Sequence, residues 1–106
     1  MNGTIVEWAP IKLAPGRTEA DLMAASDAFQ RDFLSRQPGF VRRELVRKGE
    51  GEYVDIVHWR SIEDARALME KVEGSPACQA FFSVMQMDEG ETGCVDHFAS
   101  VAVYEP

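Results

Sequence analysis

Hydrophobic residues along this chain recur with two different periods. Four segments have the alternating or continuous apolar pattern of strands and are rich in β-branched or aromatic residues: 4–13, 40–47, 52–59 and 94–104. Three others repeat apolar residues every three or four positions after a hydroxyl residue that can cap a helix: Thr18, Ser61 and Ser75. The predicted order is strand, helix, strand, strand, helix, short helix, strand.

Glycine and proline mark where these elements end. The Pro-Gly pair at 38–39 ends the first helix, and the segment 48–51 has the composition of a hairpin turn. Pro10 interrupts the first strand and cannot donate a ladder hydrogen bond, so a bulge or local irregularity is expected there. In the second helix the apolar stripe predicts that Leu68 and Met69 are both buried.

This order of elements is that of the α+β, ferredoxin-like split βαβ fold, β-α-β-β-α-(α)-β, with a four-stranded antiparallel sheet. Right-handed crossovers would place the first and third strands in the centre of the sheet and the second and fourth at its edges. The 106 residues suit one domain spanning 1–106.

The predicted sheet is apolar on both faces. Helices can cover only one face, and the other face of such a sheet is ordinarily polar. In the third strand, however, Tyr53, Val57 and Trp59 alternate with Val54 and Ile56. The simplest cover for the second face is another copy of the sheet related by a two-fold axis. We therefore expect a homodimer that packs sheet to sheet.

Composition narrows the possible partners. The formal net charge of -7 argues against nucleic acid and against anionic membranes as partners. No stretch reaches the roughly 18 uncharged residues of a membrane helix, and the first residues lack the features of a signal peptide. Cys78 and Cys94 form no CxxC motif, so reduced thiols and a cytoplasmic location are expected.

Sequence motifs for nucleophilic or nucleotide chemistry are missing. The chain has no G-x-S-x-G elbow, no G-x-G-x-x-G and no Walker loop. Its two histidines, His58 and His97, lie on predicted strands that the first strand separates, without metal-ligand spacing. We expect no metal and no cofactor.

Asp55 is the most unusual residue of the predicted sheet. It lies in the middle of a central strand and shares a face with Val57 and Trp59. A carboxylate there must be hydrogen-bonded, paired or in a wet cavity. Two interpretations remain open. One is a salt bridge to Arg42 or Arg43 on the neighbouring strand. The other is a general base whose pKa is raised by burial.

Further residues would line a pocket around Asp55. Glu7 on the first strand is a second acid, and with Trp59 the two carboxylates would form the polar end of such a pocket. Phenylalanines on the helices would line its aromatic part between helices and sheet: Phe29, Phe33, Phe81 and Phe82.

Three runs of residues together resemble the antibiotic biosynthesis monooxygenase (ABM) domain family. They are Ile-Lys-Leu-Ala-Pro-Gly-Arg at 11–17, Gln-Pro-Gly-Phe at 37–40 and Val-His-Trp-Arg-Ser-Ile-Glu-Asp-Ala at 57–65, and the resemblance covers nearly the whole chain. It implies a dimeric α+β barrel with a pocket between the sheet and the helices of each subunit. Members include cofactor-independent monooxygenases of aromatic polyketides and haem-degrading enzymes.

The functional residues of the polyketide monooxygenases are matched only in part. In those enzymes an Asn precedes the strand Trp by four positions, and a Tyr follows on the helix. Here Trp59 matches the Trp, whereas Asp55 stands at the Asn position and Ala65 at the Tyr position.

The haem-degrading members use an Asn on the first strand, a Trp on the second helix and a His on the following helix. The matching positions here are Ala9, Leu68 and Phe82, so the resemblance does not extend to haem degradation.

The sequence therefore predicts an ABM-like homodimer that binds a small, partly aromatic molecule. As an enzyme it would be an oxygenase without metal or flavin, in which Asp55 removes a proton from a phenol or enol and Trp59 positions the substrate. The expected ligand-binding residues are Glu7, Ala9, Val57, Leu68, Phe81 and Phe82. The alternative is a non-catalytic ligand-binding or structural dimer with Asp55 in a salt bridge, and an isomerase or lyase using the same carboxylate is a third possibility.

Overall fold

The computed structural model describes residues 4–86 and 95–106. Its strands are β1 (Ile5–Lys12), β2 (Phe40–Gly49), β3 (Glu52–Trp59) and β4 (Asp96–Ala99). Its helices are α1 (Glu19–Asp32), α2 (Ile62–Met69) and α3 (Pro76–Ser83), with short 3₁₀ turns η1 (Leu34–Arg36) and η2 (Val72–Gly74). No helix in this part of the chain is long and apolar enough to cross a membrane.

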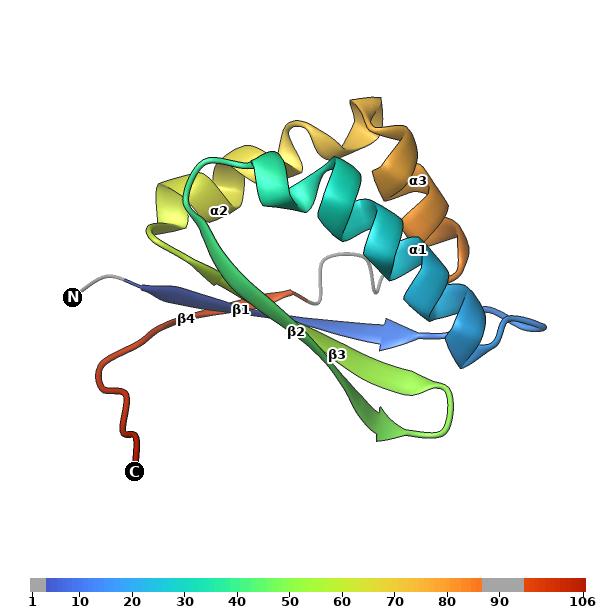
Figure 1. Cartoon of the computed structure of the whole chain (residues 1–106), viewed down its shortest axis with the longest axis horizontal. Coiled ribbons are helices and arrows are strands. Elements are labelled where there is room, and N and C mark those ends of the chain that lie inside the picture. The colour runs from blue at the N-terminus through green and yellow to red at the C-terminus, as the bar shows by residue number, and fades with distance from the viewer. Residues whose placement is uncertain (1–3, 87–94) are drawn as a thin grey trace.

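The strands form one antiparallel sheet in the order β2-β3-β1-β4. The α+β, ferredoxin-like prediction is confirmed, with β1 and β3 in the centre. All three helices lie over one face of this sheet, and the other face carries no layer of the described chain (Figure 1). The interior therefore lies between the helices and one side of the sheet.

Each helix begins at the hydroxyl residue that the sequence indicates. Thr18 Oγ1 accepts a hydrogen bond from the Asp21 backbone N–H at 3.2 Å, and Asp21 Oδ2 accepts one from the Thr18 N–H at 2.9 Å. This reciprocal pair is a capping box that occupies backbone donors left free at the helix start. Ser61 caps α2 through the Asp64 N–H, and Ser75 caps α3 in the same way.

The core is aromatic and closely filled. Phe29 stacks on Phe81 with ring centroids 4.6 Å apart and on Phe33 at 5.7 Å. Trp59 is fully buried among them. Met69 does not join this core as the helical stripe predicts, because α2 ends there and its side chain is 57% exposed.

The prediction of an irregularity at Pro10 is wrong. β1 and β3 keep an unbroken register through the pair Pro10–Val54. On its other side the described pairing of β1 with β4 runs from Ile5 to Trp8. The irregularities lie in β2 instead, between Phe40 and Arg42 and between Arg47 and Gly49.

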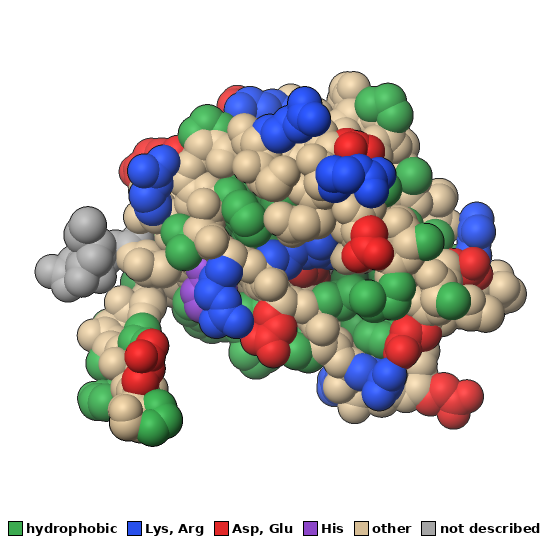
Figure 2. Space-filling model, in the orientation of Figure 1, with side chains coloured by type: hydrophobic (Ala, Val, Ile, Leu, Met, Phe, Trp, Pro, Cys, Tyr) green, Lys and Arg blue, Asp and Glu red, His purple; other side chains and the backbone are tan. Residues whose placement is uncertain are grey.

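The last strand is shorter than the prediction for 94–104. β4 spans Asp96–Ala99, and residues 100–106 have no regular secondary structure. Ser100 N–H still donates to the Thr4 carbonyl at 2.9 Å, after which the described chain offers no facing strand. β-propensity alone does not make a strand without a partner. Hydrophobic side chains are exposed along this C-terminal segment (Figure 2). Cys94 and the acidic loop at 88–93 lie outside the described residues.

Candidate functional site

A row of side chains crosses the helix-facing side of all four strands. The register pairs Arg43 of β2 with Val57 of β3, Val57 with Glu7 of β1, and Glu7 with His97 of β4. Directly opposed residues of antiparallel strands point to the same face. The row therefore places a guanidinium, a valine, one carboxylate and an imidazole side by side along the inner face of the sheet.

Asp55 and Trp59 flank this row on β3. Along that strand buried and half-buried residues alternate, and Asp55, Val57 and Trp59 are all buried. The predicted common face of these three residues is confirmed. Trp59 has no exposed surface, so its indole is held rigidly between sheet and helices.

Asp55 forms an ion pair with Arg43. Arg43 Nε donates to Oδ1 at 2.7 Å and Nη2 donates to Oδ2 at 3.0 Å, and both side chains are only 6% exposed. Arg42, the other arginine considered from the sequence, pairs with Glu44 at the surface instead. Burial raises the pKa of the Asp55 carboxyl, and the Arg43 guanidinium opposes that rise.

The guanidinium of Arg43 fills space between the helices and the sheet. Its carbon lies 5.1 Å from the ring centroid of Phe29 and 5.2 Å from that of Phe81. Nη1 also donates to the backbone carbonyl of Ser26 at 3.3 Å. Because both oxygens of Asp55 accept from this arginine, Asp55 can act as a base only after the pair opens.

Glu7 joins a second group of polar side chains. Its Oε1 accepts a hydrogen bond from Trp59 Nε1 at 3.3 Å and lies 3.1 Å from His97 Nε2. The Glu7 side chain is 13% exposed and that of His97 is 29% exposed. Burial raises the pKa of Glu7, the contacts with His97 and Trp59 oppose the rise, and the negative charge of Asp55 adds to it.

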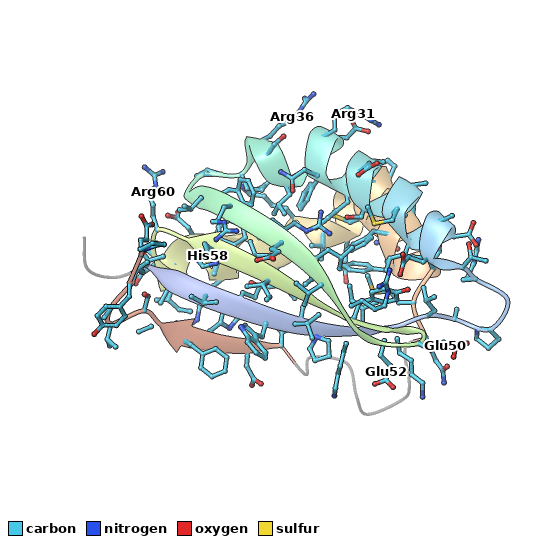
Figure 3. All side chains as sticks on the ribbon, turned by 60° about the horizontal axis from the view of Figure 1, so that its bottom comes forward. Arg31, Arg36, Glu50, Glu52, His58 and Arg60 are labelled. Atoms are coloured by element: carbon cyan, nitrogen blue, oxygen red, sulfur yellow. The ribbon has the colours of Figure 1, made fainter. Side chains whose placement is uncertain are left out.

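His58 lies on the opposite face of the sheet from His97. Figure 3 labels His58 on the sheet. His58 pairs with Val6 and Arg42, whereas His97 pairs with Glu7. Burial and the charge of Arg42 lower the pKa of His58. The two histidines therefore cannot bind one ion. Within residues 4–86 and 95–106, no three His, Cys, Asp or Glu side chains are grouped as a metal site.

The remaining sequence-predicted residues lie in the same interior. Ala9 is the register partner of Asp55 on β1. Leu68 of α2 and Phe81 of α3 are buried in the core, and Phe82 packs against it while partly exposed. Their role in binding a ligand stays a prediction.

Sequence reasoning missed a polar cluster at the other end of the sheet. Glu19 accepts two hydrogen bonds from Arg47, each at 2.7 Å, and one from the Tyr53 hydroxyl at 2.8 Å. These bonds lower the pKa of Glu19 to about 2. Two adjoining hollows of about 210 and 720 Å³ open beside it. The glutamate and arginine are 28 positions apart, so no local pattern could have joined them.

Comparisons with known proteins support the fold. No family sequence model matches the chain, and no curated protein matches it in sequence. Among solved structures, a putative antibiotic biosynthesis monooxygenase from Bordetella bronchiseptica is 24% identical, with a TM-score of 0.74 over 94% of this chain and 99% of that one. SnoaB, a cofactor-independent oxygenase from Streptomyces nogalater, is 20% identical, with a TM-score of 0.67 over 97% and 96%.

A putative antibiotic biosynthesis monooxygenase from Caulobacter crescentus is 18% identical, with a TM-score of 0.62 over 97% of this chain and 92% of that one. The chain thus has the fold of the ABM domain proteins, and the resemblance seen in the sequence is confirmed at that level.

Proposed function

We propose that the protein is a cytoplasmic, small-molecule-binding homodimer that oxygenates a small aromatic or enolisable substrate without metal or flavin. The observation that carries the proposal is the contact of Glu7 with Trp59 and His97. It joins a carboxylate of raised pKa, a rigid indole and an accessible imidazole on the inner face of the sheet. The shared fold with a cofactor-independent oxygenase supports the same reaction class.

The reaction needs an acid–base group and a site that limits water. Removal of a proton from a phenol or enol gives a carbanion, which reacts with O2 to form a carbon–oxygen bond. The resulting hydroperoxide loses water, so a CH2 group and O2 become a carbonyl group and one water. Trp59 positions the aromatic substrate in this proposal. Asp55, tied to Arg43, is the base only if the substrate opens that pair.

Anthrone is a suitable model substrate because its CH2 group is acidic and its oxidation to anthraquinone consumes O2. We expect the protein to accelerate O2 uptake above the rate in buffer, with one O2 consumed for each anthraquinone formed and no effect of EDTA. Trp59→Phe should slow turnover because it removes the hydrogen bond to Glu7. An oxygen electrode measures the O2 consumed, and absorbance measures the anthraquinone formed. Rates equal to buffer with anthrone and with naphthols would favour the non-catalytic alternative.

The homodimer is a second part of the proposal. The face of the sheet away from the helices carries Trp8 and Phe98, which are 46% and 51% exposed and meet edge to face at 6.1 Å. Val6 and Ile56 lie on the same face by register. Exposed apolar surface of this kind on a sheet is typical of an interface.

We therefore expect a mass close to twice 11.9 kDa at micromolar concentration in sedimentation or light scattering. Phe98→Glu places a charge in the proposed interface and should shift the protein towards monomer. Met69→Glu is the matched control, because Met69 is also exposed but lies on α2, on the helical side. A wild-type protein that stays monomeric would contradict this part of the proposal.

A further inference from the structure

The three contacting side chains Glu7, Trp59 and His97 are placed by backbone pairing rather than by loops. Glu7 lies on the central strand β1, between its register partners Val57 on β3 and His97 on β4. Trp59 lies two residues beyond Val57 on the same face. Sites carried on paired strands hold their side chains in a defined geometry.

The hydrogen bonds of Glu7 favour one position for the proton of the neutral His97 ring. An indole N–H can only donate, so Glu7 Oε1 is an acceptor towards Trp59. The same oxygen lies 3.1 Å from His97 Nε2. Oε1 serves as acceptor in both contacts when Nε2 carries the proton of the neutral ring. Nδ1 then has a free lone pair, and the described part of the chain makes no hydrogen bond to it.

This arrangement suits a base better than the Asp55 carboxylate does. Proton uptake at Nδ1 makes an imidazolium whose charge is compensated by the adjacent Glu7 carboxylate. His97 keeps 29% of its side-chain surface exposed, so a ligand can reach it. Asp55, by contrast, is 6% exposed and both of its oxygens accept from Arg43.

We propose that His97 is the base of this site and that Glu7 orients its ring as a positioning residue. The inference rests on the proposed oxygenase function and names the residue that starts the reaction. His97 Nδ1 takes the proton from the substrate phenol or enol, and the carbanion reacts with O2. The imidazolium returns its proton to the peroxide anion to give the hydroperoxide. Neutral His97 then takes the remaining C–H proton as the O–O bond breaks and hydroxide leaves, and the imidazolium protonates the hydroxide to give water, which restores the neutral ring.

The first test follows the proton on a bound probe. 1-Naphthol is neutral in water at pH 7, and its absorption changes when it becomes the naphtholate. We expect the wild type to bind it with the naphtholate spectrum, and His97→Asn to bind it with the neutral spectrum. Glu7→Gln keeps an acceptor oxygen but loses the charge, so it should give a mixture of the neutral and naphtholate spectra. Glu63→Gln, an exposed acid on α2, is the control and should match the wild type.

Kinetics on anthrone give the second measurement. His97→Asn should lower kcat by about 100-fold or more, as loss of a general base does, while KM changes little. Glu7→Gln should lower kcat by a smaller factor and leave KM unchanged. If the kcat of His97→Asn equals that of the wild type, His97 is not the base, even if the protein is an oxygenase.

The third measurement does not need turnover. Long-range ¹H–¹⁵N correlation spectra show which ring nitrogen of a neutral histidine is protonated, and His58 in the same spectrum provides a comparison. We expect His97 to carry its proton on Nε2 in the wild type. A proton on Nδ1 would overturn the inference. Absence of anthrone oxidation in the wild type would contradict the proposed function instead, and the tautomer and the naphthol spectrum would still decide whether the pair accepts a proton.

Discussion

Arg43→Met should lower the free energy of unfolding by about 3–5 kcal/mol, because it leaves a buried carboxylate without its partner. The Asp55 side chain is 6% exposed and accepts both of its short hydrogen bonds from this arginine. Methionine has the length to fill the space beside Phe29 and Phe81 but offers no donor. Denaturant melts at fixed protein concentration measure the loss, since the stability of the proposed dimer would depend on concentration.

Asp55→Asn in the same experiment separates the two interpretations of Asp55. In the wild-type background we expect a smaller loss of about 1–3 kcal/mol, because Arg43 keeps its bond to the Ser26 carbonyl and its two aromatic neighbours. In the Arg43→Met background the same substitution should cost nothing or stabilise, because it removes an unpaired charge. That result would identify the ion pair as the role of Asp55, and the proposed catalytic role would be withdrawn. A gain of stability in the wild type would instead support a poised base.

The exposed pair of Glu19 and Arg47 is the matched control. It has the same two-bond geometry, at 2.7 Å for each bond, but its side chains are 42% and 61% exposed. Ion pairs in contact with water contribute little to stability. Glu19→Gln should therefore change the melt far less than Arg43→Met, which would show that burial rather than geometry determines the cost.

Local patterns were sufficient to predict the layers of the fold. A two-residue period and right-handed crossovers placed Asp55 and Trp59 on the inner face of a central strand, and the structure confirms both. The same rules could not choose between Arg42 and Arg43. The register shift between Phe40 and Arg42 decides which arginine faces the helices, and such a shift leaves no signal in the alternation of β2.

The contact between Glu7 and His97 depends on register over a much longer distance. The two residues are 90 positions apart, and a slip of one residue between β1 and β4 would turn His97 to the other face. The sequence indicated that His58 and His97 lie on strands and do not bind one metal ion together. It could not indicate which residues contact each histidine, because the pairing of distant strands decides this. For the same reason the end of β4 was misplaced, because strand length follows the partner available.

Gly39 is the position where adding a single methyl group should cause the next largest loss in the free energy of unfolding. It has φ +81 in the turn immediately before β2, in the left-handed region that glycine adopts without penalty. A Cβ built there would overlap the Asp64 carboxylate and lie only 2.6 Å from Asp64 Cβ. Asp64 cannot easily move, because it belongs to the first turn of α2 and its N–H and carboxylate both bond to Ser61. The Gly39 carbonyl also accepts the Arg60 N–H at 2.8 Å, which ties β2 to the start of α2.

Gly39→Ala should therefore lower the free energy of unfolding by about 1–2 kcal/mol for the left-handed backbone, with about 1–3 kcal/mol more for the overlap with Asp64. Gly16→Ala isolates the first contribution, since Gly16 has φ +82 but no atom within 4 Å of an added Cβ. The difference between the two melts measures the close approach of β2 to α2. Equal losses in the two variants would mean that Asp64 moves aside freely. The contact between Gly39 and the first turn of α2 would then not be rigid.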